Sequence, residues 1–594
     1  MSDRVVDVDN PAGDRYQYGS LDQATEQIRL LSFDLTKPPP GRHENLHGDL
    51  IQIPLRSTEC PAYYALSYLW NVPGPAGTLQ INGQEISITH NLHRALVRVL
   101  SWLYAEARRE EHTYIWADAV CINQRDDKEK SWQVGMMKDI FSHSRETLAY
   151  IGHDIEGAER AIVTLNTLAD IGTLGLYGVT SFIHSQEKLL TSDVEDLESV
   201  KHLFQQRYFK RIWVFQEVVL SRRLRFLSNT GSINGNIVSK AVTTLQHAGI
   251  ISIEHMNSRD PSLAWARLLD ALSVPLGIRE IMGNREVYRE NHKRTILQLL
   301  SSKMVSDLEA TQPIDHIYAL LGLSSDAGEL ELQPDYTLSW GQAFARLTEA
   351  LIKRHGMVAL QTILILSLHT RVPDWPSWMP FWGRPALNLS SFSFDNSGHS
   401  WHLFSAARST IQTPVIYGGP SRKPYLRFEA FHCGTVVTIT PSEVSDALLS
   451  KAPRTAWYRA WANTLHKFFA EHYPEDDPAH LAYRFLRADV DWEFDSRTFR
   501  RIQEVVDDGT CSVMTMSEHA NRCVFTSSDG RIGRAFDTIE NGDQVWIIKG
   551  IEFPVILRQE SEKSFSFVSD AYVQGIMDGE FLATNPECQY IELV

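Results

Sequence analysis

Between Tyr63 and Ser228 the sequence alternates short β-rich runs with amphipathic helical segments, and this alternation constrains the fold more than any other feature. Apolar residues such as Leu92, Leu96 and Val99 recur between the runs at the spacing of one helical face. The pattern therefore predicts an α/β domain with a mainly parallel sheet. Its four expected strands lie at 63–70, 114–120, 147–151 and 224–228.

Local signals predict where several elements begin. Asn82-Gly83, inside residues 78–88, suits the tight turn of a small hairpin. Asn91 is expected to cap the helix that follows, because an Asn side chain accepts from free amides there. Asp126 or Asp127 is expected to begin the next helix, since an acidic side chain is stabilised at the positive end of a helix.

The composition and the hydrophobic pattern change along the chain, and these changes predict four regions. The first residues hold little apolar material to bury, the middle is amphipathic and helical, and the last third has short strands separated by Gly-containing turns. Residues 455–473 read as a helical insertion among those strands. The regions are a disordered tail over 1–25, the α/β domain over 26–250, a helical region over 251–372 and a β-rich C-terminal module over 373–594.

Charge and composition exclude several classes of protein. Lys and Arg number 57 against 73 Asp and Glu, so the net charge is −16, which argues against binding to nucleic acid or to an anionic membrane. The N-terminus lacks the apolar core of a signal peptide, so we expect a cytoplasmic protein. The six cysteines show neither a Cys-x-x-Cys pair nor metal spacing, so we expect reduced thiols, no metal and no bound cofactor.

Three blocks in the first half resemble the signature of a known family. They read YYALSYLW from Tyr63, YIWADAVCINQRDDKEKSWQVGMMKDIFSHS from Tyr114 and RYFKRIWVFQEVVLS from Arg207, and in this order they resemble the heterokaryon incompatibility (HET) domain of filamentous fungi. Two positions depart from the family pattern: Asn71 replaces a Gly, and Ala117 replaces a large aliphatic residue. The resemblance implies a role in nonself recognition and programmed cell death.

The HET domain is in turn similar to TIR domains, whose flavodoxin-like sheet can cleave NAD. TIR domains carry a Trp followed four residues later by a catalytic Glu, and Trp213 and Glu217 stand at this spacing on an expected helix. The resemblance therefore implies that Glu217 is a catalytic carboxylate. One carboxylate suits this reaction, because cleavage between nicotinamide and ribose creates an oxocarbenium-like centre and the leaving group is already cationic before it departs.

Part of the site follows from the rule that open α/β sheets bind ligands at the carboxyl ends of strands, where the strand order reverses. Asp118, after the second strand, lies to one side of this point. For the strand order 2-1-3-4, the rule selects residues 67–70 and 151–154. Under the NAD hypothesis an indole stacks on a ring, and a hydroxyl or guanidinium contacts phosphate or ribose. The candidate ligand-binding residues are Ser67, Tyr68, Trp70, Asp118, Arg211 and Trp213.

Each candidate also has a structural interpretation. Glu217 would be a surface carboxylate paired with Arg222 or Arg211. Asp118 would cap a turn or accept from Asn123, and the tryptophans would fill the core. Cys121 has no adjacent base and would be a buried, inert thiol.

Three functions remain open on the sequence alone. One is an NAD glycohydrolase that acts after self-association, with NAD or a related nucleotide as its substrate. Another is a non-catalytic signalling module that triggers cell death by assembly with a protein partner. The third is an accessory protein of transcription or metabolism that merely carries the domain. A pocket around Glu217 would favour the enzyme, whereas a carboxylate sealed by an Arg would favour the signalling module.

Overall fold

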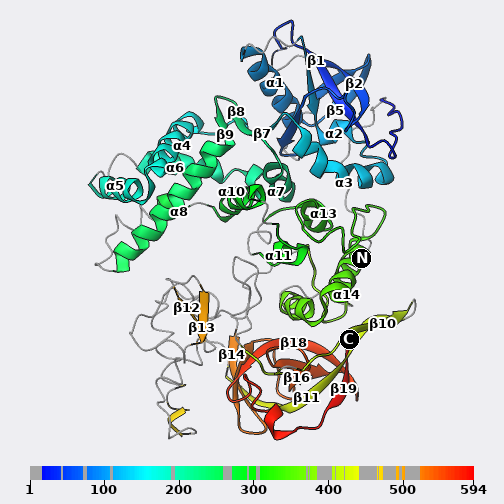
Figure 1. The fold of residues 1–594 in the computed structure, drawn as a ribbon, viewed down its shortest axis with the longest axis vertical. Coiled ribbons are helices and arrows are strands. Elements are labelled where there is room, and N and C mark those ends of the chain that lie inside the picture. Colours follow the sequence, from blue (N-terminus) through cyan, green and yellow to red (C-terminus); the bar gives the residue numbers. More distant parts are fainter. Residues whose placement is uncertain are drawn as a thin grey trace. The chain divides into compact units, whose positions relative to one another are not determined.

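The chain folds into two compact units, the first comprising residues 1–299 and 307–339 and the second residues 300–306 and 340–594 (Figure 1). The predicted helical region, 251–372, is thus shared between the units. The computed structural model describes residues 16–39, 41, 45–70, 77–106, 111–188, 194–257, 270–273, 275–290, 293–302, 308–368, 372, 375–383, 404–408, 410–419, 422–440, 465, 467, 469–471, 490–493, 498–501 and 522–594.

The first unit is built on a nine-stranded sheet with the order β5-β4-β2-β1-β6-β3-β7-β8-β9. The four expected strands are β3, β6, β7 and β8, which pair in parallel at its centre in the chain order 2-1-3-4. The strands span β1 Gln27–Asp34, β2 Leu46–Pro54, β3 Tyr63–Tyr68, β4 Gly77–Ile81, β5 Gln84–Ile88, β6 His112–Trp116, β7 Glu146–Gly152, β8 Leu224–Ser228 and β9 Ser232–Asn234.

The sheet as a whole is mixed, so the expectation of a mainly parallel sheet is too simple. β1 pairs antiparallel with both β2 and β6, and β9 pairs antiparallel with β8. Antiparallel neighbours need only short connections, whereas parallel neighbours need a long crossover. The alternation of strands and helices identified the crossovers and missed β1, β2 and β9.

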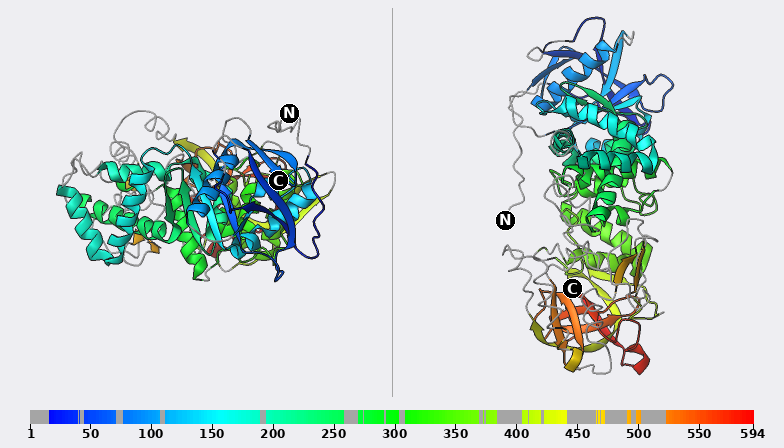
Figure 2. Two further views of the ribbon diagram at one scale, coloured as in Figure 1. Left: turned by 90° about the horizontal axis from the view of Figure 1, so that it is seen from above. Right: turned by 90° about the vertical axis from the view of Figure 1, so that its left-hand side faces the viewer.

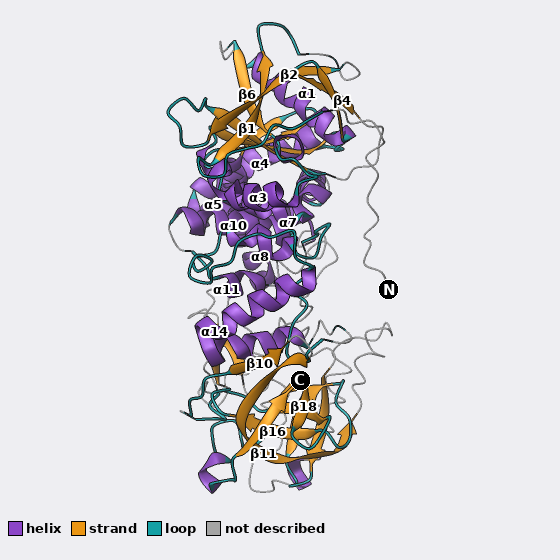
Figure 3. Cartoon of the chain, turned by 90° about the vertical axis from the view of Figure 1, so that its right-hand side faces the viewer, coloured by secondary structure: helices purple, strands orange, loops and turns teal. Residues whose placement is uncertain are grey.

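Helices pack around this sheet and extend the unit beyond it. The segments of α4, α6 and α8, cyan to green in Figure 2, lie side by side, and Figure 3 shows these helices in purple. The helices of this unit span α1 His90–Ala105, α2 Asp118–Cys121, α3 Asp127–His143, α4 Ala158–Thr173, α5 Gly175–Lys188, α6 Val194–Phe204, η1 Arg207–Lys210, α7 Ile212–Val219, α8 Gly235–Asn257, α10 Leu276–Arg289, α11 Ile296–Leu300 and α13 Asp315–Leu321.

The local signals hold with one exception. Asn82 and Gly83 both take positive φ between β4 and β5, as a tight hairpin turn requires. Asp126 caps α3 by accepting from two backbone amides. The expected cap at Asn91 is wrong: Thr89 caps α1, and Asn91 instead donates to the Leu69 carbonyl at 2.7 Å. Asn91 lies inside the helix and anchors it to the loop after β3.

The described part of the expected N-terminal tail is anchored. Tyr18 donates to the Val120 carbonyl at 3.0 Å, and the Gly19 carbonyl accepts from Arg29 at 2.6 Å. The sequence shows little apolar material here, but these contacts use a hydroxyl and the backbone, which composition does not reveal. Residues 1–15 lie outside the described residues.

The second unit contains an eight-stranded sheet in which β11 pairs with β14 on one side and with β16 on the other. The sheet therefore closes on itself around an apolar core that includes Phe525, Ile547 and Ile556. The expected helical insertion over 455–473 lies largely outside the described residues. The strands span β10 Val415–Gly419, β11 Arg422–Thr440, β14 Arg522–Ser527, β15 Ile532–Phe536, β16 Gln544–Ile548, β17 Val555–Gln559, β18 Ser564–Val573 and β19 Gln589–Leu593, with β12 Val490–Glu493 and β13 Thr498–Arg501 as a separate pair.

Helix α14, Trp340–Ser367, belongs to this unit and breaks at Gly356, whose φ is 60°. Trp375 stacks on Trp340 with ring centroids 5.1 Å apart. Across the described parts of both units, no helix combines the length and apolar character needed to span a membrane.

Candidate functional site

Glu217 is the only acidic residue of α7, a helix of eight residues that are all buried. Apart from Gln216 and Glu217 the helix, IWVFQEVV, is apolar, and such a helix lies in the interior. It packs against α10, α13 and strand β3. The sequence of the third signature block thus places a carboxyl group inside the domain, where it needs polar partners.

Both carboxylate oxygens of Glu217 have partners, and the residue is only 1% exposed. Oε2 accepts a short hydrogen bond from the Ser67 hydroxyl, and Oε1 lies 3.2 Å from Nη1 of Arg211. The Ser67 hydroxyl is also 2.7 Å from the Tyr208 hydroxyl. The carboxylate is therefore sealed by an arginine and two hydroxyl-bearing side chains.

Arg211 connects Glu217 to a second carboxylate. Its Nη1 also donates to the Tyr68 carbonyl at 2.7 Å, and its Nη2 lies 3.4 Å from Oδ2 of Asp118. The same Asp118 oxygen accepts from the Trp70 indole at 2.9 Å, and the guanidinium carbon lies 5.9 Å from the centre of the Trp70 ring. One guanidinium thus lies between two carboxylates and beside an indole.

Burial and charge set the electrostatics of this cluster. Burial raises the pKa of Glu217 to about 7, although the positive charge of Arg211 opposes this shift. For Arg211, burial works to lower the pKa, but Glu217 and Asp118 outweigh it and leave the pKa above its usual value. Arg211 therefore stays charged, while Glu217 titrates near neutral pH.

The cluster lies at the carboxyl ends of β3 and β6. Ser67 is near the end of β3, Trp70 follows it, and Asp118 stands two residues after β6, where α2 begins. The expected strand 114–120 is thus too long, because β6 ends at Trp116 and Asp118 bonds to the next amide at 2.9 Å. The second segment selected by the rule, 151–154, does not join the cluster; Asp154 is exposed and pairs with Arg94.

Most of the candidate ligand-binding residues meet in this cluster. Ser67, Trp70, Asp118 and Arg211 contribute side chains to it, and Tyr68 contributes its carbonyl oxygen. Trp213 is not among these contacts; it acts instead on Asp315, where it opposes the rise in the pKa of that buried carboxyl. That Trp213 binds a ligand stays a prediction.

The structural interpretations fare differently. Glu217 is not a surface carboxylate, but its pairing with Arg211 is confirmed. Burial raises the pKa of Cys121 to about 12, which keeps its thiol protonated and supports the inert interpretation. Trp116 is fully buried, as a core residue should be.

Sequence reasoning missed the residues that hold α7 in place. At its start, the Ile212 amide donates to the Glu309 carbonyl at 3.0 Å, and the Glu309 amide donates to the Lys210 carbonyl at 2.5 Å. At its end, Arg285 of α10 donates to the carbonyls of Val218 and Ser221, each at 2.5 Å. Burial lowers the pKa of Arg285 to about 9.

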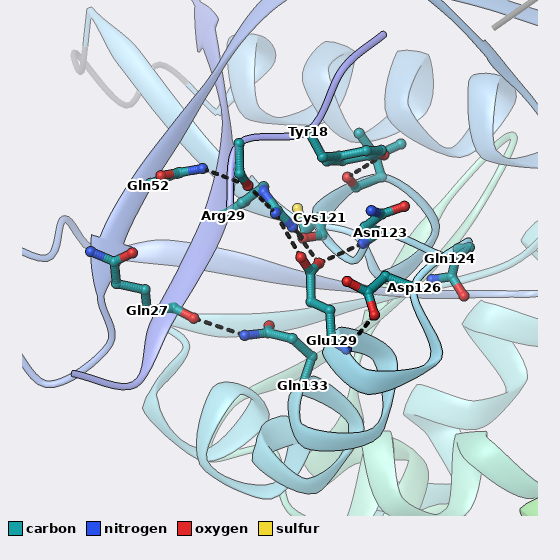
Figure 4. A network of polar contacts seen from close by, with 12 residues as sticks. Tyr18, Gln27, Arg29, Gln52, Cys121, Asn123, Gln124, Asp126, Glu129 and Gln133 are labelled. Carbon is teal, nitrogen blue, oxygen red and sulfur yellow. Dashed lines mark hydrogen bonds and ion pairs between the residues drawn. The ribbon is translucent and has the colours of Figure 1, made fainter. Parts of the chain in front are cut away.

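A second buried network fixes the loop after β6 (Figure 4). Arg29 of β1 forms two contacts with Glu129 of α3, at 2.6 and 2.9 Å, and donates to the Cys121 carbonyl at 3.0 Å. Glu129 also accepts from the Asn123 amide at 2.7 Å. The middle signature block therefore has a structural role, since its conspicuous polar residues tie α3 to the sheet.

A cleft of about 880 Å³ lies between α3 and residues 318–337. On α7 it touches Gln216 and not Glu217. The candidate carboxylate therefore does not line this cleft. Among the described residues, no group of three or more His, Cys, Asp and Glu side chains is arranged to hold a metal ion.

Comparisons with known proteins match two segments of the chain. Residues 63–217, from β3 to Glu217, match the family described as "Heterokaryon incompatibility protein (HET)", and residues 450–591 match the "Het-6 beta-barrel domain". The "Heterokaryon incompatibility protein 6, OR allele" of Neurospora crassa is 23% identical over 681 aligned positions, which cover 96% of this chain and 97% of that protein. No solved structure matches the chain.

Proposed function

We propose that the chain is a heterokaryon incompatibility (HET) domain protein of the fungal type and that it acts in the cytoplasm in nonself recognition and programmed cell death. The support is the extent of the similarity, since the fungal relative aligns along nearly the whole of both chains.

For the mechanism, the single observation that carries most weight is the closure around Glu217. Both of its oxygens are occupied and the side chain is sealed by Arg211. In this state no sugar reaches the carboxylate. The closed geometry therefore favours a signalling module, which starts cell death by self-association or by assembly with a protein partner.

A second candidate is cleavage of NAD by a TIR-like site, and the position of the cluster favours it. Glu217 lies beside the carboxyl ends of two parallel strands, where open α/β sheets bind ligands, together with an indole and a hydroxyl. In this proposal Glu217 stabilises the oxocarbenium-like centre, and Ser67 orients Glu217. The reaction requires Arg211 to leave Glu217 first.

Nicotinamide release separates these candidates. The full-length protein is incubated with NAD at high protein concentration, as wild type, Glu217→Ala and Glu146→Ala. Glu146 is the matched control because it is also buried, and it pairs with Arg225 at 3.1 Å outside the cluster. Catalysis predicts release by wild type and Glu146→Ala and its loss in Glu217→Ala.

The outcome in fungal cells completes this test. If cell death on expression survives Glu217→Ala, the signalling module is supported; equal or absent nicotinamide release in all three proteins removes the NAD hydrolase. If Glu217→Ala abolishes both nicotinamide release and cell death, the carboxylate is catalytic.

A further inference from the structure

Asp118, Glu217, the Tyr68 carbonyl and Trp70 surround Arg211 and form a negatively charged binding site, which we call the seat. Glu217 and Asp118 each present a carboxylate oxygen to the guanidinium, at 3.2 and 3.4 Å, and the Tyr68 carbonyl adds a third acceptor at 2.7 Å. The Trp70 ring stands at one side, held by its bond to Asp118. Two carboxylates, a carbonyl and an indole recognise one kind of group, a flat cation with its charge spread over a plane.

Arg211 belongs to the protein itself but enters this seat from the loop between η1 and α7. Its side chain is only 12% exposed, so the guanidinium fills the space between the two carboxylates. Arg211 is the N-cap residue of α7, but its side chain forms no capping hydrogen bond with that helix.

The backbone of Arg211 is held by the backbone of Glu309, which lies 98 positions further along the chain and is called the strap. Residue 211 forms an isolated parallel bridge with Glu309, flanked by the two hydrogen bonds that join Lys210 and Ile212 to Glu309. The Glu309 side chain itself is exposed. The strap thus fixes the start of the Arg211 side chain through backbone bonds alone.

We infer that Asp118, Glu217 and Trp70 form a seat for a planar organic cation, and that Arg211, held by the strap at Glu309, fills this seat in the resting protein. The guanidinium of Arg211 thus occupies the position that the ligand cation would take. Opening requires Arg211 to swing out, which frees both carboxylates at once. The ligand class rests on the proposed NAD hydrolase, since the nicotinamide ring of NAD is a planar cation.

The probe is 1-methylnicotinamide, a planar cation without a ribose or phosphate, compared with neutral nicotinamide. Binding is measured by calorimetry on full-length wild type and Arg211→Gln. The variant should bind the cation roughly tenfold more tightly than wild type, because the seat is empty. Neutral nicotinamide should show no such gain. Arg225→Gln is the matched control, since Arg225 also pairs with a buried carboxylate and lies 4.7 Å from the Trp102 ring.

A second pair of variants tests the strap without changing any charge of the seat. Glu309→Pro removes the amide that bonds Lys210, whereas Glu309→Ala keeps it. Labelling of Glu217 by a carbodiimide and an amine, mapped by mass spectrometry, should rise in Glu309→Pro and Arg211→Gln and stay at the wild-type level in Glu309→Ala and Arg225→Gln. Circular dichroism confirms that the variants are folded.

The results separate this inference from the proposed enzyme. Stronger cation binding and labelling in the opened variants, without any nicotinamide release from NAD, support the seat and reject the hydrolase. Equal cation binding in wild type and Arg211→Gln, or equal labelling of Glu217 in all variants, overturns the seat. Weaker binding of the cation by Arg211→Gln also overturns it, because Arg211 would then be a ligand contact.

Discussion

The carboxyl group of Glu217 shows how one residue links stability to protonation. Its pKa of about 7 lies well above the usual value of a Glu, because the folded protein buries it. At a pH between the usual pKa of a Glu and about 7, Glu217 is deprotonated in the unfolded chain but keeps its proton in the folded protein. The free energy of unfolding must therefore fall as pH rises through this window.

The corresponding prediction compares wild type with Glu217→Gln, which cannot titrate. From pH 4.5 to pH 7.5 the wild type should lose up to about 3 kcal/mol of unfolding free energy relative to the variant, as a shift of this size implies. Urea unfolding at several pH values measures the difference. Parallel curves for the two proteins would show that Glu217 has an ordinary pKa.

The buried pair of Arg29 and Glu129 is a second test at the residue scale. Glu129→Gln leaves Arg29 charged in the interior, so the variant should lose about 3–5 kcal/mol of unfolding free energy. The control is Glu26→Gln, which breaks the exposed pair with Arg56 and should cost less than about 1 kcal/mol. Similar losses in the two variants would contradict a structural role for the Arg29 network.

The residue scale also shows what sequence spacing can identify. Spacing and family resemblance selected Glu217, and the strand-end rule selected Ser67 and Trp70, all of which meet in the structure. The seal by Arg211 was only one alternative among several, because burial depends on contacts from η1 and from residue 309 that no local pattern encodes. No local pattern links Trp213 to Asp315 either, because Asp315 lies 102 positions further along the chain.

At the scale of elements, α7 is stable because other elements complete its ends. A helix of eight residues leaves most of its terminal amides and carbonyls without internal partners, and an isolated helix of this length does not form in water. Arg285 of α10 supplies the C-terminal partners, and the strap at Glu309 supplies an acceptor and a donor beside the N-terminus.

Replacing Arg285 tests this dependence. Arg285→Ala leaves buried carbonyls at the end of α7 without their donor and should lower the unfolding free energy by about 3 kcal/mol. Arg289→Ala, one turn further along α10, removes a more exposed contact with Asn236 and should have little effect. Equal stability of the two variants in urea unfolding would show that α7 does not need the Arg285 contacts.

The sheet also shows which elements local sequence patterns predict and which they miss. The order of β6, β3, β7 and β8 agrees with the crossovers that the strand and helix alternation predicts. β1, β2 and β9 escaped notice because their antiparallel pairing is set by register with other strands, which hydrophobic periodicity does not report. The cap at Thr89 was missed because Asn91 is an equally good cap by type, and only the backbone geometry decides between them.

At the scale of the molecule, the HET match ends at Glu217 but the folding unit does not. Residues 270–339 supply Arg285, Glu309 and Asp315, all of which contact α7 or its first turn. The sequence boundary at 250 therefore separates the cluster from the residues that hold it. The first compact unit, which extends to Ser339, includes them.

Truncation tests where the domain ends. A fragment of residues 1–339 should unfold in one cooperative transition and keep Glu217 protected from carbodiimide labelling, because it retains every contact to α7 described above. A fragment of residues 1–257 retains the whole sheet but loses both ends of the α7 support. It should expose apolar surface and aggregate, or label at Glu217. If the shorter fragment is as stable and as protected as the longer one, residues 270–339 are an accessory to the fold and the strap cannot control the site.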